Sequence, residues 1–222
     1  MKKILSILIV FFPWVIRRWL LIKIWKYEIH STAKIGFSYI NPRNLRMEKN
    51  SYIGNFNVAI NLDQVVLGES STIIRLNWIT GFPTKTSSRH FRHQKNRRSE
   101  LIIGCNSAIT KNHHIDCTNQ IVIGNFVTIA GYYSQFLTHS INIEKNIQDS
   151  KPINIGDYTF IGTNSVLLGG ANLPAYSVLG AKGLLNKYYT EEYTLYGGVP
   201  ANPISLISRD AKYFKREKGF VY

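Results

Sequence analysis

The sequence contains few cysteines and few acidic residues. Its two cysteines, Cys105 and Cys117, form no recognisable disulfide or metal-binding pattern, which is consistent with a reducing compartment. Asp and Glu number 13 against 27 Lys and Arg, so the 222-residue chain has a formal charge of +14. Because no helix-turn-helix, zinc-finger or RNA-binding signature accompanies this charge, we expect no nucleic-acid partner.

Long apolar runs are also absent. The apolar stretch 4–16 is too short to span a bilayer and contains a proline, and no signal-peptide cleavage site follows it. Segment 1–28 combines Trp14, Trp19 and Trp25 with flanking cations, which favours a helical segment associated with a membrane surface. The alternative is a helix packed on the domain as a cap, or an oligomer contact.

The positive charge is concentrated at the two ends of the chain and in the segment 81–100, while the middle of the chain is close to balanced. Basic edges on a neutral body suit an anionic membrane surface or a phosphorylated ligand. Charges that only contact solvent account for part of this excess.

An aliphatic residue returns at every sixth position of the segment 153–185. The six residues are Ile155, Ile161, Leu167, Leu173, Leu179 and Leu185. Neither a helix nor a single strand has this period. Three short strands joined by tight turns make a triangular coil of about 18 residues, with one aliphatic residue pointing inward from each side. The period therefore predicts an all-β fold, a parallel β-helix built from hexapeptides.

Other positions of the repeat agree with this interpretation. Gly156, Gly162 and Gly180 follow aliphatic positions, where we expect a turning backbone. Upstream the same period slips several times, and a slip indicates an insertion that a solenoid pushes outward as a loop. We expect the β-helix over 29–192, with loops at 81–100 and 132–152. Residues 193–222 would form a turn and a short helix that caps the open end.

Four motifs in a fixed order carry a family resemblance: "IVIGNFVTIAGYYSQFLTHSI", "KPINIGDYTFIGTNSVLLGGANLP", "SVLGAKGLLNK" and "YGGVPANPI". With them, residues 29 to about 205 resemble the hexapeptide-repeat acyltransferases. The longer N-terminal segment, with "GFSYINPRNL", "LNWITGFP" and "SRHFRHQ", is similar to polysaccharide-biosynthesis O-acetyltransferases. The resemblance implies a left-handed β-helix, acetyl-CoA as co-substrate, no metal, and a homotrimer with active sites between adjacent prisms.

The resemblance also implies the roles of individual residues. His139 in "LTHS" matches the general base of the family, and an imidazole can take the proton of a sugar hydroxyl as the oxygen attacks a thioester. His114 either acts in the same cleft or caps a turn. Asp116 matches a residue that holds the acceptor sugar, and we add Tyr132 to the substrate-binding set.

Two further groups complete the predicted site. The family binds CoA along the last coils, at positions that correspond here to Thr163, Ala181, Asn186 and Lys187. In the basic loop, Arg89 and Arg92 are candidates for binding an anionic or diphosphate-linked acceptor. A loop that is merely solvated explains these two arginines equally well.

These residues predict an acetyl-CoA-dependent O-acetyltransferase. Its acceptor would be a sugar of a capsule or other cell-surface polysaccharide, or its polyprenyl-diphosphate-linked precursor, at the cytoplasmic face of a bacterial inner membrane. One alternative is N-acetylation of an amino sugar, and another is a non-catalytic scaffold in a membrane complex. A metal enzyme similar to γ-class carbonic anhydrase needs three converging histidines, but adjacent His113 and His114 on a strand point to opposite faces.

Overall fold

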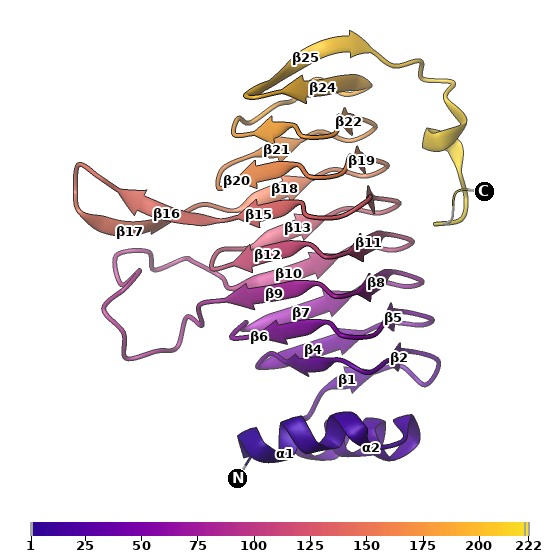
Figure 1. The fold of residues 1–222 in the computed structure, drawn as a ribbon, viewed down its shortest axis with the longest axis vertical. Helices are drawn as coiled ribbons and strands as arrows, with labels where there is room; N and C mark the ends of the chain where they lie inside the picture. The colour runs from indigo at the N-terminus through magenta and orange to yellow at the C-terminus, as the bar shows by residue number, and fades with distance from the viewer. Residues whose placement is uncertain (1, 220, 222) are drawn as a thin grey trace.

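The computed structural model describes all residues except 1, 220 and 222, and it shows a solenoid of three parallel sheets (Figure 1). Sheet A consists of β1 (Glu28–Ile29), β4 (Asn44–Met47), β7 (Gln64–Leu67), β10 (Glu100–Ile103), β13 (Ile121–Ile123), β18 (Ile153–Ile155) and β21 (Asn172–Leu173). Sheet B consists of β2 (Lys34–Ile35), β5 (Tyr52–Ile53), β8 (Thr72–Arg75), β11 (Ala108–Lys111), β14 (Thr128–Ile129), β19 (Phe160–Ile161), β22 (Val178–Leu179), β24 (Thr194–Gly198) and β25 (Ala201–Leu206). Sheet C consists of β3 (Tyr39–Asn41), β6 (Val58–Ile60), β9 (Trp78–Gly81), β12 (His114–Cys117), β15 (Gln135–Leu137), β20 (Val166–Leu168) and β23 (Leu184–Leu185).

The repeat places one inward apolar side chain on each sheet of a coil. In the C-terminal coils Ile155 stacks on Leu173, Ile161 on Leu179, and Leu167 on Leu185, with all six side chains buried. Burial of these aliphatic columns is the main favourable term that holds successive coils together. The all-β architecture predicted from the period is confirmed, and it is consistent with the left-handed β-helix fold of acetyltransferases.

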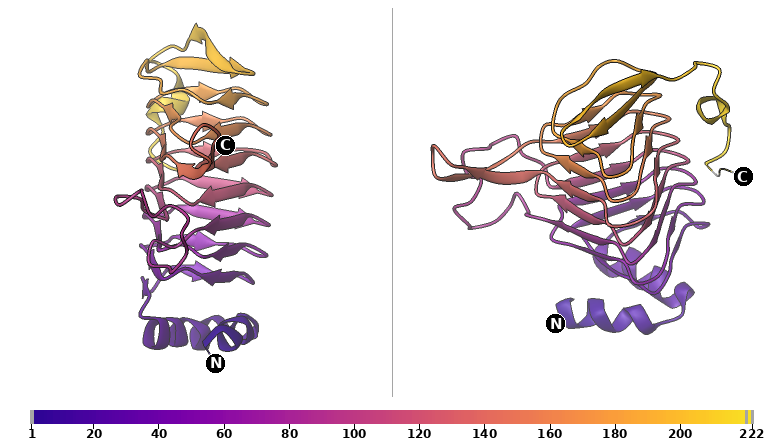
Figure 2. Two further views of the ribbon diagram at one scale, coloured as in Figure 1. Left: turned by 90° about the vertical axis from the view of Figure 1, so that its left-hand side faces the viewer. Right: turned by 45° about the horizontal axis from the view of Figure 1, so that its top comes forward.

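The register slips occur mainly at the corner where the chain passes from sheet C to sheet A. Ala59 and Leu67 are both buried and lie eight positions apart instead of six. One coil later the loop 82–99 leaves the solenoid at this corner, between β9 and β10. Two coils after that, the hairpin of β16 (His139–Asn142) and β17 (Ile147–Ser150) leaves from it too. Both insertions extend to the same side of the solenoid (Figures 1 and 2).

Part of the predicted loop 132–152 remains in the solenoid. Residues 135–137 form β15, which pairs with β12 on one side and with β20 on the other. Phe136 is fully buried and occupies the inward position that an aliphatic residue holds elsewhere. The aromatic residue comes one position late in the period, which hid this strand from the repeat.

The repeat glycines serve close packing rather than a left-handed backbone. A Cβ added to Gly156 would lie 2.4 Å from the nitrogen of Ala175, and one added to Gly162 would lie 2.5 Å from the nitrogen of Ala181. The positive φ values occur two positions later, at Tyr158 (55°) and Asn164 (56°). The repeat therefore identifies positions that require glycine, but glycine is required because the backbone of the next coil lies too close for a Cβ atom.

The N-terminal segment forms α1 (Lys2–Leu8), η1 (Ile9–Phe11) and α2 (Trp14–Trp25), which lie across the first coil (Figures 1 and 2). The buried Arg17 of α2 donates to the carbonyl oxygen of Gly36 at 2.7 Å, and Arg18 donates to that of Ile29 at 2.7 Å. The helices therefore cap the end of the solenoid. No helix in the described part of the chain is long and apolar enough to cross a membrane.

The opposite end is covered by strands, so the expected capping helix is wrong. Strands β24 and β25 form an antiparallel hairpin over the last coil, because "GGVP" allows a tight reversal with Gly198 at a φ of 100°. The only helical turn in the described tail is the short 3₁₀ helix η2 (Lys212–Lys215). It lies beside the solenoid, where the Tyr213 hydroxyl donates to the carbonyl oxygen of Thr159 at 3.0 Å.

A column of stacked rings holds this tail. Phe126 stacks on Tyr158 at 4.5 Å between ring centroids, and Tyr176 stacks on Tyr193 at 4.9 Å. Arg216 covers the column and donates a hydrogen bond to the carbonyl oxygen of Phe126. Two basic residues of the tail, Arg209 and Arg216, therefore lie against aromatic rings of the protein itself.

Candidate active site

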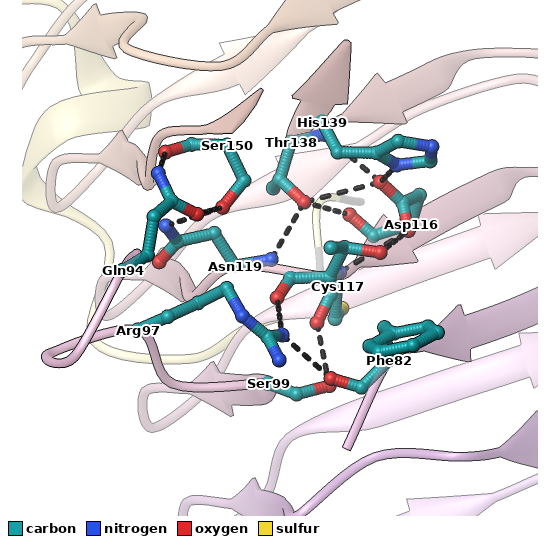
Figure 3. Close-up of polar contacts among 11 residues, drawn as sticks. Phe82, Gln94, Arg97, Ser99, Asp116, Cys117, Asn119, Thr138, His139 and Ser150 are labelled. Atoms are coloured by element: carbon teal, nitrogen blue, oxygen red, sulfur yellow. Dashed lines mark hydrogen bonds and ion pairs between the residues drawn. The ribbon is translucent and has the colours of Figure 1, made fainter. Parts of the chain in front are cut away.

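Asp116 and His139 come together at the corner from which both insertions leave. Asp116 lies on the outer face of β12, and His139 is the first residue of β16. Since β12 pairs with β15, the residues that follow β15 are brought next to Asp116 on the neighbouring coil. The His139 Nδ1 atom lies 2.7 Å from Asp116 Oδ2 (Figure 3).

The Asp116 carboxylate is held by two threonines as well as by His139. Thr118 donates to Oδ1 from its hydroxyl at 2.7 Å and from its backbone N–H at 3.1 Å. Thr138 donates to Oδ2 from its backbone N–H at 3.2 Å and from its hydroxyl at 3.1 Å. Burial by itself would raise the pKa of Asp116, but the hydrogen bonds from His139 and Thr118 outweigh it and the pKa is lowered. Asp116 is therefore ionised at neutral pH.

The ionised Asp116 determines the state of the His139 ring. The hydrogen bond to Asp116 raises the pKa of His139, while partial burial opposes this rise. An ionised carboxylate accepts from Nδ1–H, so the neutral ring has its lone pair on Nε2. The side chain is 43% exposed. The pair thus offers a proton acceptor to a molecule that arrives from solvent.

The predicted role of Asp116 differs from its place in the structure. We expected this carboxylate to hold the acceptor sugar. Both of its oxygens instead accept hydrogen bonds from the protein, and one of them binds the His139 ring. Asp116 is therefore placed to orient the general base that the sequence predicted.

A hollow of about 320 Å³ lies beside His139, between the hairpin β16–β17 and the ends of the sheet C strands. Asn186, one of the residues predicted to bind CoA, lines this hollow together with His139. Lys187 follows Asn186 in sequence, and its Nζ donates to Asn202 Oδ1 at 3.3 Å. Two of the four predicted CoA-binding residues are thus at the same corner as the base.

The other predicted residues lie at the opposite edge of sheet C, where the chain enters it from sheet B. The Tyr132 N–H donates to Thr163 Oγ1 at 3.1 Å. Ala181 follows on the next coil, against Gly162. Strands of sheet C separate these three residues from His139 within one chain.

The two adjacent histidines point in opposite directions, as the sequence predicted, although β12 begins only at His114. His114 is exposed on the outer face, two residues before Asp116. His113 is fully buried, its Nε2 lies 3.0 Å from Thr110 Oγ1, and burial lowers its pKa to about 4. The three histidines do not converge, and no group of His, Cys, Asp and Glu among the described residues could hold a metal ion.

The basic loop contributes Phe91, a residue that the sequence did not single out. The Phe91 ring meets the His139 ring edge-on, with 6.2 Å between centroids. The buried Arg97 lies 4.8 Å from the centre of the Phe91 ring and donates to the carbonyl oxygen of Thr118. Loop 82–99 therefore packs against the Asp116–His139 pair. A phenylalanine flanked by basic residues in an otherwise polar loop was the available signal.

Of the two arginines predicted to bind the acceptor, one faces a cavity. Arg89 lines a second hollow of about 270 Å³ between loop 82–99 and the hairpin, together with His90 and His93. Arg92 donates to the carbonyl oxygens of Ser87 and Ser88 in its own loop. The structure therefore separates these two arginines into different environments.

The structural neighbours of the chain are acetyltransferases. A hexapeptide-repeat acetyltransferase from Vibrio cholerae matches with a TM-score of 0.51 and 26% identity, over 64% of this chain and 73% of that one. The same protein complexed with acetyl coenzyme A matches with a TM-score of 0.51 and 26% identity, over 64% and 70% of the two chains. AntD, an N-acyltransferase from Bacillus cereus in complex with dTDP-4-amino-4,6-dideoxyglucose and coenzyme A, matches with a TM-score of 0.55 and 14% identity, over 76% and 84%. No protein-family model matches the sequence, and no curated protein matches it.

These neighbours confirm the resemblance to the hexapeptide-repeat acyltransferases that the four motifs predicted. They support an acyltransferase activity for the chain. At 14% identity the likeness to AntD concerns the fold alone.

Proposed function

We propose that the protein is an acetyl-CoA-dependent acetyltransferase that transfers the acetyl group to a sugar hydroxyl. The Asp116–His139 pair beside an open hollow is the observation that carries this proposal, because a hydroxyl needs a base before it can attack a thioester. The acetyl coenzyme A complex of the Vibrio cholerae neighbour supports the choice of donor. Asn186 and Lys187 are the residues at this corner that we expect to meet CoA.

The reaction needs two proton transfers, and the His139 ring carries out both. His139 Nε2 takes the proton of the acceptor hydroxyl as the oxygen bonds to the thioester carbonyl carbon. The resulting tetrahedral intermediate then breaks its carbon–sulfur bond, and the CoA sulfur receives the proton from the imidazolium. Throughout, the Asp116 carboxylate accepts from Nδ1–H and stabilises the charged ring. The products are the acetyl ester and CoA with a free thiol.

The same site could serve an amine, as in N-acetylation of an amino sugar. A neutral amine is already a good nucleophile and loses its proton only after the C–N bond has formed, so its attack has less need of a base than the attack of a hydroxyl. The oriented pair therefore favours O-acetylation. Parallel assays with neutral sugars and amino sugars test this choice, and exclusive N-acetylation would reverse it.

We also propose that the acceptor is anionic, for example a polysaccharide with acidic groups or its polyprenyl-diphosphate-linked precursor. Loop 82–99 contains six Lys and Arg and no acidic residue. Its Arg89 faces the hollow next to the hairpin. We expect Arg89→Ala to raise KM for anionic acceptors and not for neutral ones. An equal effect on both kinds of acceptor would remove this part of the proposal.

We further infer that the protein rests on the cytoplasmic face of a bacterial inner membrane and assembles as a homotrimer. The N-terminal helices leave several large apolar side chains exposed, which supports a membrane surface as partner. A trimer would supply the Tyr132, Thr163 and Ala181 edge from a neighbouring chain, because one chain keeps that edge apart from His139. Light scattering of the purified chain tests the trimer, and a monomer would contradict it.

His139→Ala is the direct test of the catalytic proposal. We expect transfer to fall by about 10²–10⁴ while binding of acetyl-CoA, measured by calorimetry, is retained. His30→Ala serves as the matched control, since His30 is an exposed histidine between β1 and β2, in the first coil. Wild-type turnover in the His139 variant would show that another group is the base.

A further inference from the structure

An exposed tryptophan lies close to the Asp116–His139 pair on the outer face of sheet C. Trp78 is the first residue of β9, and its side chain is 48% exposed. In the parallel ladder its partner on the next coil is His114, and the partner of His114 is Gln135. These three side chains form one row across three consecutive coils. All three are exposed.

The row runs beside the residues that carry the chemistry. Asp116 is paired with Thr80, two residues after Trp78, so Trp78 and Asp116 are diagonal neighbours on the same face. Such diagonal neighbours are about 7–8 Å apart. The His139 ring is hydrogen bonded to Asp116 and therefore lies at the edge of this surface. Trp78 is thus connected to the imidazole through Asp116, and we expect a sugar that covers Trp78 to reach toward His139.

The chemistry of this row suits a pyranose. The indole ring is flat and apolar, and one face of a pyranose carries mainly C–H groups that pack on such a ring. The hydroxyls at the edge of the sugar need hydrogen-bond partners, and His114 and Gln135 offer donors and acceptors on the adjacent coils.

We propose that Trp78 is the platform on which the acceptor sugar stacks, with His114 and Gln135 at its edge. This inference rests on the proposed function, and it assigns the exposed row of sheet C to the acceptor rather than to CoA. It also gives His114 a substrate-binding role in place of a catalytic one. The site takes a pyranose whose reacting hydroxyl projects toward His139.

Steady-state kinetics of the full chain test the platform. The probes are acetyl-CoA with methyl glycosides of glucose, galactose and their N-acetylated counterparts. We expect Trp78→Ala to raise KM for the glycoside about tenfold and to leave KM for acetyl-CoA unchanged, because only stacking is lost. Trp78→Phe keeps a flat ring and should recover most of the affinity. Trp19→Ala is the matched control, since Trp19 is 59% exposed on α2.

Two results would overturn the platform while leaving the proposed function intact. One is an unchanged glycoside KM in an active Trp78→Ala enzyme. The other is a Trp78→Ala variant that changes oligomeric state in analytical ultracentrifugation, because Trp78 would then lie in a contact between copies. If the wild-type chain releases no CoA with any of these glycosides, binding of each glycoside is measured by the quenching of tryptophan fluorescence instead. A glycoside that quenches the wild type and not Trp78→Phe supports the platform, and the absence of that difference removes it.

Discussion

At the residue scale, the proposed chemistry depends on one hydrogen bond between a carboxylate and an imidazole. Asp116 keeps its charge because its oxygens accept from Thr118, Thr138 and His139. Its charge in turn favours the protonated form of His139 and fixes the tautomer of the neutral form. A base of raised pKa is a stronger proton acceptor, and it is active only above that pKa.

Asp116→Asn should change both the rate and its pH dependence. The base works in its neutral form, so wild-type kcat/KM rises with pH through the raised pKa of His139. Without the carboxylate that pKa falls, and the acidic limb of the profile moves to lower pH. We also expect kcat to drop by about 10²–10⁴, because the tautomer is no longer held. Asp210→Asn, in the exposed tail, is the control. If the acidic limb does not move, it reports the titration of a group other than His139.

His113 makes a second, structural prediction. Its folded pKa of about 4 lies below the value of 6.5 for an unperturbed histidine, so the unfolded chain binds the extra proton first as pH falls. The free energy of unfolding should therefore decrease between about pH 6.5 and pH 4, by up to ~3 kcal/mol from this group. Denaturant titrations at several pH values measure the slope. The slope should shrink in His113→Asn and persist in His114→Asn, and an equal slope in all three proteins would contradict the assignment.

At the scale of elements, loop 82–99 and the hairpin β16–β17 are joined beside the site by a group of hydrogen bonds, which we call the clasp. The Gln94 side-chain amide of loop 82–99 donates to Asp149 Oδ1 at 2.7 Å. It also donates to the carbonyl oxygen of Ser150 at 2.8 Å (Figure 3). The Ser150 hydroxyl also accepts from Asn119 at 3.0 Å, and the Asn119 N–H donates to Thr138. The clasp thus links the loop, the hairpin and the corner that carries Asp116.

Gln94→Ala should loosen the hairpin and slow catalysis together. Each lost hydrogen bond is worth about 0.5–1.5 kcal/mol, so amide hydrogen exchange across 139–150 should speed up by about tenfold or more. We expect kcat to fall several-fold, since His139 begins this hairpin. Lys95→Ala, an exposed neighbour in the same loop, should change neither measurement. Unchanged exchange in the Gln94 variant would show that the hairpin is rigid without the clasp.

At the scale of the whole molecule, the two ends of the solenoid are covered by different kinds of element. The hairpin β24–β25 covers one end. The N-terminal helices cover the other, burying Ile9 and Leu21 toward the first coil. Their other faces remain apolar and exposed, at Ile4, Ile7, Leu8, Phe11, Phe12, Val15, Ile16 and Trp19. A monomeric soluble protein rarely exposes so many apolar side chains in one region.

Binding to vesicles tests whether a membrane covers this end. The full chain should cosediment with vesicles that contain anionic phosphatidylglycerol, through apolar contact and attraction to its +14 charge. Val15→Asp should weaken the binding strongly, because Val15 is 79% exposed on α2. Val199→Asp places the same change at the opposite end, on a residue that is 73% exposed, and should bind like the wild type. Equal binding of the two variants would exclude the helices as the membrane contact.

The sequence by itself determined the fold, because a strict six-residue period admits a three-sided coil and neither a helix nor a flat sheet. It also located His139 and Asn186, which follow recognisable motifs at the ends of coils. Only the tertiary structure decided the partner of His139, since Asp116 lies 23 positions earlier and reaches the ring through the pairing of β12 with β15. The tertiary structure was also needed to find Phe91, Gln94 and Trp78. Their importance depends on which coils and loops lie side by side, and a repeat pattern carries no record of how its insertions fold back on each other.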